Sequence, residues 1–361
     1  MKTTREQFAA GRVGAVEKLA GKSVMIFGAG YIGSRLAAQA CAAGARVVAL
    51  TRNAERAAEL AGLRVGEGVR VIRADLASSE WHDEVASALA AAGGGGGEDV
   101  VVNCVSGGGM AGGVHGYRRS YLEGMRSIVA WAHATGQRGR LVYTSSTSVY
   151  PQGDGVRVTE SMPTATGADA ADGAGAGTDV AGEVLLETER EALQGWPGGG
   201  VCVLRLAGIY GPARHHLLGQ LRAAVATGAE LPGGADDHLN LIYRDDVCDA
   251  VWAAALATAG GGGGGGCAGE QPVFNIADDA PPTRAELCGW LAERLGLPVP
   301  RFSGQPAAGR RRRTPDRLIV NERAKRVLGW APRHPTFREG YEAIFERPAS
   351  NVEHPTSNGG Q

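Results

Sequence analysis

One segment constrains the fold more than any other: KSVMIFGAGYIG at residues 22–33. Its apolar first half predicts a short buried strand, and its second half contains Gly28, Gly30 and Gly33 in the spacing G-x-G-x-x-G. In that motif the first glycine allows a tight turn, and the second lets the backbone approach a pyrophosphate. The third glycine lets a helix lie close to the strand.

The surroundings of the glycines strengthen this interpretation. A chain with 57 glycines can contain the spacing by chance, but here a strand precedes the motif and an apolar helix is predicted over Tyr31–Ala43. The amino terminus of such a helix offers unpaired N–H groups and a partial positive charge to phosphates. We therefore expect a dinucleotide to contact Gly28, Gly30, Tyr31, Ile32 and Gly33.

Composition narrows the class of protein. A chain of 361 residues with 43% hydrophobic residues can bury the core of one large or two medium domains. Its 37 basic and 38 acidic residues nearly balance, and no apolar run reaches the length of a membrane span, so neither nucleic acid nor a membrane is an expected partner. The amino terminus lacks the apolar core of a secretory signal. We expect a cytoplasmic location, with an organellar targeting segment as the open alternative.

Strands that alternate with helices predict an α/β fold of the Rossmann type, with a doubly wound parallel sheet. We assign residues 22–211 to an NAD(P)-binding domain, to which 239–258 and 272–279 return. Residues 212–238 and 280–346 are expected to form a small carboxyl-terminal substrate-binding domain. The remaining segments are an amino-terminal extension and a disordered tail, residues 1–21 and 347–361.

Seven strands are expected in the sheet: Val24–Phe27, Ala45–Leu50, Val69–Arg73, Asp99–Val105, Arg140–Ser145, Val201–Leu206 and Val273–Ala277. A single long helix is expected over Tyr117–Thr135, and a polar loop over residues 153–178. The segment 238–243 is expected to be a hairpin or a strand. The scattered cysteines lack metal-ligand spacing and are expected to be free thiols.

The end of the second predicted strand distinguishes the two dinucleotides. NAD sites usually have Asp or Glu there for the ribose 2′-hydroxyl, whereas this chain has Thr51-Arg52-Asn53. Arg52 favours a 2′-phosphate, so NADP is preferred and NAD remains the alternative; a simply solvated arginine is the other interpretation. Later strand ends supply the other expected contacts: Asp75, Leu76, Cys104 and Val105 for the cofactor and Ser106 for the substrate.

Several segments resemble, in order along the chain, the extended short-chain dehydrogenase/reductase group, the NAD(P)-dependent epimerase/dehydratase family. The resemblance covers about residues 22–346. Within the family, the chain most resembles an atypical branch whose members often lack the usual catalytic dyad. The segments are GAGYIG (28–33), RLVYTSSTSVY (140–150), RLAGIYGP (205–212), LIYRDDVCDAV (241–251), VFNIADD (273–279) and RVLGWAPRHPTFREG (326–340).

The resemblance implies that Ser146 orients the reacting oxygen of the substrate. It also implies a Tyr-x-x-x-Lys motif about 25 residues later, in which the lysine lowers the pKa of an acid/base tyrosine. This chain has no tyrosine between Tyr150 and Tyr210 and no lysine between Lys22 and Lys325. A tyrosine without a neighbouring cation is a poor base at pH 7, so the usual proton carrier is missing.

Other side chains are alternative proton carriers. Tyr150 lies near Ser146, although a tyrosine at this place in the motif more often packs or contacts substrate. Asp179 and Glu183 share one face of a predicted helix, where they act either in proton transfer or as charges that meet the helix dipole. His115 and Tyr117 face either the nicotinamide or solvent.

The substrate side is expected to include Tyr210 and Arg313. Arg313 belongs to an arginine run, residues 310–313, in a stretch where the family often binds a nucleotide-sugar diphosphate, and arginine suits phosphates; the alternative is a solvated loop. His215-His216 has no carboxylate or cysteine at metal spacing, so no metal site is expected.

The leading hypothesis is an NAD(P)-binding, epimerase/dehydratase-like oxidoreductase with a non-standard active site. Its substrate is expected to be a small polar or nucleotide-linked molecule, and Ser146 and Tyr150 are its candidate catalytic residues. The alternative is a catalytically inactive NAD(P)(H)-binding sensor or scaffold. A homodimer is expected to form through the helices Tyr117–Thr135 and Asp179–Leu193.

Overall fold

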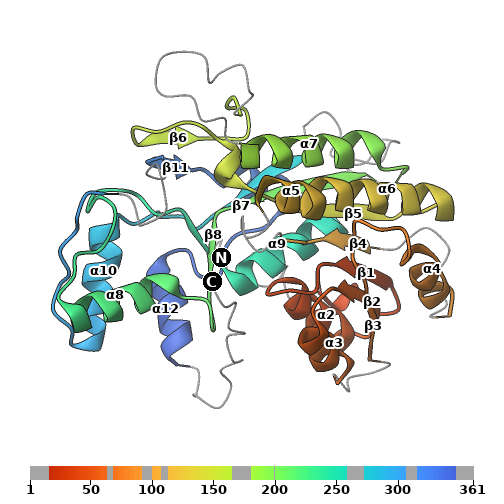
Figure 1. Ribbon diagram of the computed structural model, residues 1–361, viewed down its shortest axis with the longest axis horizontal. Helices are drawn as coiled ribbons and strands as arrows, with labels where there is room; N and C mark the ends of the chain where they lie inside the picture. Colours follow the sequence, from red (N-terminus) through yellow and green to blue (C-terminus); the bar gives the residue numbers. More distant parts are fainter. Residues whose placement is uncertain are drawn as a thin grey trace, which may run out of the picture.

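The computed structural model describes residues 16–62, 68–91, 100–106, 113–164, 180–198, 200–257, 272–305 and 315–346. A seven-stranded parallel sheet forms its centre, in the order β10-β7-β5-β4-β1-β2-β3 (Figure 1), which confirms the predicted fold class. Its strands are β1 (Ser23–Phe27), β2 (Arg46–Thr51), β3 (Val69–Arg73), β4 (Val100–Asn103), β5 (Arg140–Ser146), β7 (Val201–Leu206) and β10 (Val273–Ile276).

Helices cover both faces of the sheet (Figure 1). On one face lie α2 (Gly33–Ala42), α3 (Ala54–Ala61), α9 (Arg244–Leu256) and α11 (Glu322–Leu328). On the other face lie α4 (His82–Ala91), α5 (Gly113–Arg118), α6 (Gly124–Thr135) and α7 (Val180–Gly195). None of the helices in these described ranges is long and apolar enough to cross a bilayer.

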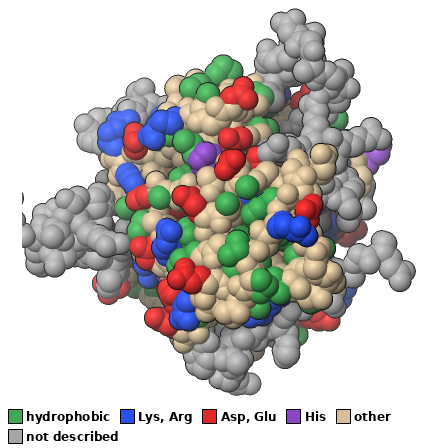
Figure 2. Space-filling model, turned by 90° about the vertical axis from the view of Figure 1, so that its left-hand side faces the viewer, with side chains coloured by type: hydrophobic (Ala, Val, Ile, Leu, Met, Phe, Trp, Pro, Cys, Tyr) green, Lys and Arg blue, Asp and Glu red, His purple; other side chains and the backbone are tan. Residues whose placement is uncertain are grey.

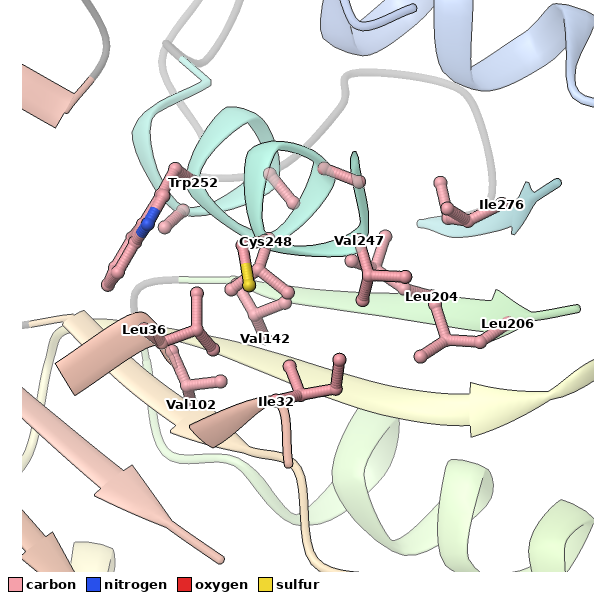
Figure 3. Close-up of a cluster of buried hydrophobic side chains, with 14 of the residues drawn as sticks. Ile32, Leu36, Val102, Val142, Leu204, Leu206, Val247, Cys248, Trp252 and Ile276 are labelled. Atoms are coloured by element: carbon pink, nitrogen blue, oxygen red, sulfur yellow. The ribbon is translucent and has the colours of Figure 1, made fainter. Parts of the chain in front are cut away.

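The sequence of β1 shows why the sheet is buried on both faces. All five of its residues are buried, and successive side chains point to opposite faces. Val24 and Ile26 belong to one hydrophobic cluster, and Met25 and Phe27 to the other. Figure 3 shows the first cluster, in which α9 packs over the central strands β5 and β7.

A second, smaller hydrophobic core lies beyond the carboxyl ends of the strands. It is formed mainly by α8 (His216–Thr227), α10 (Arg284–Leu295) and α12 (Phe337–Phe345). Thr283 and Thr336 start α10 and α12 with capping boxes. Figure 2 shows acidic, basic and apolar side chains interspersed over this side of the molecule.

A charged clamp fastens residues 330–334 to α9. The Asp246 carboxylate accepts hydrogen bonds from the backbone N–H groups of Arg333 and His334, at 2.8 and 2.9 Å. Asp249 pairs with the Arg333 guanidinium at 2.5 and 2.6 Å. The Trp330 indole N–H donates to the backbone carbonyl of Asp246. Residues 330–334 are therefore fixed over the helix that covers the sheet.

Of three local predictions, two differ from the structure and one is confirmed. The long helix predicted over residues 117–135 contains a π-helical turn, Arg119–Glu123, between α5 and α6. The segment 238–243, predicted to be a hairpin or a strand, contains the short strand β9 (Leu241–Tyr243), which pairs in parallel with β8 (Gly208–Tyr210). The predicted polar loop contains β6 (Val156–Val158), which pairs with β11 (Arg317–Ile319) from much later in the chain.

Some predictions fall on residues outside the described ranges. These include Asp179, the arginine run with Arg313, most of the amino-terminal extension and the tail. Of the six cysteines, the five within the described ranges are free thiols.

Candidate functional site

A cavity of about 900 Å³ opens at the carboxyl ends of the sheet strands. Ligands in open α/β sheets bind at this edge, outside the strand ends. The cavity extends from the glycine turn after β1, past the end of β5, to residues that border the second core. It therefore unites segments from across the chain in one space.

The glycine turn has the geometry that its sequence predicts. Gly28 has φ +88°, and a Cβ atom there would lie 2.6 Å from the backbone of Val105. A Cβ atom on Gly33 would collide with the carbonyl oxygen of Gly28. A Cβ atom on Gly30, in contrast, would meet nothing within 4 Å, and Gly30 lines the cavity. Two glycines are required by packing, and the third leaves space for a ligand.

The amino terminus of α2 suits an anion. Its N-cap residue, Ile32, makes no side-chain capping bond, and the first turn has no acidic residue. The first N–H groups of a helix have no partner within the helix, and they carry a partial positive charge. A pyrophosphate therefore fits the turn between β1 and α2.

Two further predicted cofactor residues line the cavity and hold the glycine turn in place. The Tyr31 hydroxyl donates to the Pro212 carbonyl at 2.9 Å, and burial raises the pKa of that hydroxyl. The Cys104 thiol lies 3.3 Å from the Gly28 carbonyl, and burial raises the pKa of Cys104 to about 12. The thiol therefore stays protonated as a donor to the turn.

Beyond the carboxyl ends of β2 and β3, Arg52 and Asp75 both line the cavity. Arg52 is exposed and makes no hydrogen bond or ion pair with any part of the chain that the structure describes. Asp75 pairs with Arg119 at 2.9 Å. Burial acts to raise the pKa of Asp75, but the hydrogen bond from Arg119 and the nearby charge of Arg52 hold it below its ordinary value. Arg52 is thus available to an anionic ligand.

The predicted catalytic serine lies on the cavity wall. The Ser146 oxygen accepts a hydrogen bond from the Ser148 backbone N–H at 3.1 Å, which leaves its own hydroxyl hydrogen to donate. Its neighbour Ser145 also borders the cavity, but its hydroxyl donates to Glu189 at 2.6 Å. Of these two serines, Ser146 is the one whose proton remains for a substrate oxygen.

Tyr150, the second predicted catalytic residue, does not line the cavity and is only 1% exposed. Its hydroxyl donates to Asn275 at 2.8 Å and accepts from Arg205 at 2.9 Å. The 3₁₀ turn Thr147–Val149 precedes it and leads the chain inward. Burial raises the pKa of Tyr150, although Arg205 opposes the shift. This placement argues against the predicted catalytic role.

Tyr210 was predicted to contact the substrate, but it lies in the second core with 4% of its surface exposed. Its ring stacks on Tyr341 at 5.3 Å, and its hydroxyl lies against Gly340, where a Cβ atom would collide with it. Its neighbours in β8, Gly208 and Ile209, line the cavity instead. Tyr210 therefore packs in the second core and is not part of the described lining of the cavity.

The remaining predicted residues divide into two groups. Leu76, Val105 and Ser106 line the cavity, as predicted for cofactor and substrate contacts. Glu183, His115 and Tyr117 do not belong to its described lining. Arg313 and Asp179 lie outside the described residues.

The structure adds residues that the sequence did not single out. Ser120 and Tyr121 line the cavity from the π-helical turn, a feature that often marks functional sites. Near the second core, the lining includes His238, Arg214 and Arg284. The Arg284 Nε atom is buried and has no hydrogen-bond partner among the described residues. No sequence spacing signals these positions, because they come together only in the fold.

His238 is held by a carboxylate. Its Nδ1 atom lies 2.9 Å from the Asp316 Oδ1 atom, and the same oxygen accepts from the His238 backbone N–H at 2.9 Å. Asp316 directly precedes β11. No cluster of three or more His, Cys, Asp or Glu side chains within the described ranges has the arrangement of a metal site.

The sheet, the glycine turn and the cavity at the strand ends together define a nucleotide-binding protein of the Rossmann class. The particular family follows from sequence comparison. A sequence model of the NAD dependent epimerase/dehydratase family matches residues 24–277, so the chain belongs to that family. This confirms the family resemblance seen in the sequence motifs.

Two proteins with similar sequences and one solved structure with a similar fold can be compared with this chain. Protein YeeZ of Escherichia coli K12 is 30% identical over 217 residues, which are 60% of this chain and 65% of that protein, less than two thirds of its length. A 3-diazoavenalumate denitrifying reductase of a Streptomyces species is 29% identical over 231 residues, 62% of this chain and 70% of the reductase. The structure of the Bordetella bronchiseptica enzyme WbmG, in complex with NAD and UDP, has a TM-score of 0.68 and 17% identity. The match covers 90% of this chain and 94% of that one, and it shows a shared fold.

Proposed function

We propose that this protein is an NADP(H)-dependent oxidoreductase of the epimerase/dehydratase type, with NAD(H) as the alternative cofactor. The observation on which this rests is a single cavity that joins three features: the glycine turn, the unpaired Arg52 and the available hydroxyl of Ser146. The family membership and the similarity to a reductase support an oxidoreductase.

The chain's own residues suit this role. The turn at Gly28–Gly33 and the start of α2 would hold the pyrophosphate. Arg52 would pair with the 2′-phosphate, because a guanidinium forms strong charge-assisted bonds to phosphate oxygens. When bound, the nicotinamide supplies or accepts a hydride. Ser146 would donate a hydrogen bond to the reacting oxygen of the substrate and orient it.

We further propose a small polar or nucleotide-linked substrate. Arg214 and Arg284 line the far end of the cavity, and Arg284 has a buried nitrogen that awaits an acceptor. The enzyme WbmG, whose fold is similar, was determined with UDP. Anionic groups such as phosphates would satisfy both arginines.

Calorimetric titration tests the cofactor site. NADPH is expected to bind at least about tenfold more tightly than NADH. The substitution Arg52→Asp should weaken NADPH binding about tenfold or more, which corresponds to about 1.4 kcal/mol, and should have little effect on NADH binding. The control, Arg138→Asp, makes the same charge change at an exposed position in the turn before β5. This turn lies at the amino ends of the strands, whereas the cavity lies at their carboxyl ends. Equal affinity for NADPH and NADH would identify an NAD site. No binding of either cofactor would refute the proposed function.

One observation favours a second candidate, a sensor or scaffold that binds NAD(P)(H) without catalysis. Tyr150 is enclosed in a hydrogen-bond network and is not among the described residues that line the cavity. A sensor would bind NADPH but oxidise none of it with sugar nucleotides or small carbonyl compounds. Turnover of any such compound above the background rate would exclude this alternative.

A further inference from the structure

We propose that His238 is the acid/base residue of this site and that Asp316 is its positioning residue. The inference rests on the proposed oxidoreductase function and supplies the proton carrier that the chain otherwise lacks. The sequence has no lysine between Lys22 and Lys325, and Tyr150 is buried away from the cavity.

The geometry of the pair suits proton transfer. The Asp316 carboxylate accepts from both the Nδ1 atom and the backbone N–H of His238, at 2.9 Å each. A carboxylate in this position fixes the orientation and tautomer of an imidazole and stabilises its protonated form. The other ring nitrogen, Nε2, is left for a ligand, and His238 is the one histidine in the described lining of the cavity.

The segment that contains Asp316 is also connected to the segment that contains Ser146. Arg317, the residue after Asp316, donates to the backbone carbonyls of Thr147 and Tyr150 at 2.9 and 2.6 Å. The Gly155 N–H donates to the Asp316 carbonyl at 2.9 Å. The segment that holds His238 is thus hydrogen-bonded directly to the turn that follows Ser146.

The proton balance is simple. In the oxidation direction, the substrate hydroxyl proton passes to Nε2 of His238, and the C–H bond breaks to deliver a hydride to the oxidised nicotinamide. A carbonyl forms, and the imidazolium is paired with the Asp316 carboxylate. In the reduction direction, Nε2 returns the proton to the oxygen while Ser146 donates its hydrogen bond to the same atom.

The first test uses chemical labelling, which requires no substrate. Diethyl pyrocarbonate acylates neutral imidazole nitrogens, and mass spectrometry locates the product. At an alkaline pH, where the imidazole is neutral in both proteins, we expect His238 to be labelled and its rate to fall several-fold in Asp316→Asn, because the ring nitrogen loses the carboxylate that makes it more nucleophilic. His133, outside the cavity, should keep its rate as an internal control. Absence of label on His238, or an equal rate in the variant, would overturn the proposal.

The second test measures NADPH oxidation with 9,10-phenanthrenequinone, a small dicarbonyl probe. His238→Gln should lower kcat by roughly 10²–10⁴-fold with little change in KM. Added imidazole should partly restore His238→Ala, which a purely structural role would not allow. His133→Gln is the matched control. Tyr121→Phe tests whether the tyrosine that lines the cavity carries the proton instead. A His238→Gln variant that keeps its kcat within threefold would contradict the inference.

The outcomes separate the two proposals. If the wild-type protein binds no NADPH, the proposed function fails, and the role of His238 fails with it. If NADPH binds but His238 is not labelled, only the inference about His238 falls. If NADPH binds and the quinone is not reduced, the labelling result decides whether the inference about His238 stands.

Discussion

At the scale of single residues, a buried ion pair organises the segment behind the site. Glu189 on α7 and Arg205 on β7 are both buried, and their side chains meet at 2.7 and 3.1 Å. Ser145 donates to the same glutamate, and Arg205 also donates to Tyr150. Four polar side chains thus satisfy one another beneath the serine turn.

We expect Glu189→Gln to lower the free energy of unfolding by about 3–5 kcal/mol, because it leaves the Arg205 charge buried without its counter-charge. Urea denaturation would measure the loss. Glu191→Gln is the matched control, since Glu191 pairs with Arg126 at 3.4 Å in a half-exposed position and should cost less than about 1 kcal/mol. A loss of similar size in both variants would contradict this account.

The same network explains why the sequence misled at Tyr150. A tyrosine beside a catalytic serine is a reasonable candidate, but its direction depends on Arg205 and Asn275, which lie 55 and 125 residues away. By contrast, the role of Gly28 was predictable because the turn is local. Residues whose surroundings are distant in sequence were the ones that local patterns could not place.

At the scale of elements, the glycine turn offers a sharp comparison between two substitutions. Gly30→Ala should leave stability within about 0.5 kcal/mol, because a methyl group there would meet no atom of the described residues within 4 Å. It should still weaken NADPH binding about tenfold or more, since the methyl group occupies space that a phosphate requires. Gly33→Ala should instead lower stability by about 1–3 kcal/mol through overpacking.

Thermal unfolding and calorimetric titration of the two variants would test this difference. Equal loss of stability in both would show that Gly30 is also confined by the protein. Unchanged NADPH binding in a folded Gly30→Ala variant would count against the placement of the pyrophosphate.

The elements of the sheet were largely predictable, whereas the short pieces around the site were not. Most of the sheet strands are apolar runs between turns, and this pattern suffices for a strand buried on both faces; the edge strand β3 has two exposed arginines. The pairing of β6 with β11 joins residues about 160 positions apart, and each strand has only three residues. The π-helical turn is a hydrogen-bonding detail within a continuous helical pattern. Neither leaves a periodic signal.

At the scale of the whole molecule, we retain the prediction of a homodimer through α5, α6 and α7, which lie side by side on one face (Figure 1). Multi-angle light scattering should give twice the mass of the chain at micromolar concentration. Ala130→Arg, at an exposed position of α6, should produce monomers, whereas Ala90→Arg, exposed on α4, should not. A monomeric wild-type protein would refute the prediction.

The pH dependence of stability provides another whole-molecule test. Asp278 is 1% exposed, and burial together with the charge of Asp246 raises its pKa well above the ordinary value. The folded state therefore favours the protonated carboxyl. Above the unfolded pKa of about 3.9, only the unfolded state ionises freely, so this group lowers stability as pH rises.

Asp278→Asn removes this penalty. Its stability relative to the wild type should rise from pH 4 toward neutral pH, with a slope of at most about 1.4 kcal/mol per pH unit. Urea denaturation of both proteins across this range would measure the difference. A difference that does not change with pH would show that Asp278 is ionised in the folded protein.

The cavity itself shows the limit of prediction at this scale. The glycine turn at one end of the cavity belongs to one contiguous motif, so its geometry was predictable from the sequence. The other end of the cavity is assembled from α10, the segment before β9 and the segment before β11. His238 and Asp316 are 78 residues apart, so only the packing of the second core against the sheet brings them together.

The charged clamp on α9 has a consequence for the order in which the protein is made. Asp246 and Asp249 lie within a helix that covers the sheet, but their partners belong to residues 330–334. During synthesis the sheet strands leave the ribosome well before those partners. Until residues 330–334 arrive, the buried Asp246 carboxylate lacks the two backbone N–H groups that it binds in the folded protein, so the part of that face around Asp246 stays hydrated. The nucleotide-binding half is therefore expected to reach its final packing only when nearly the whole described chain has been synthesised.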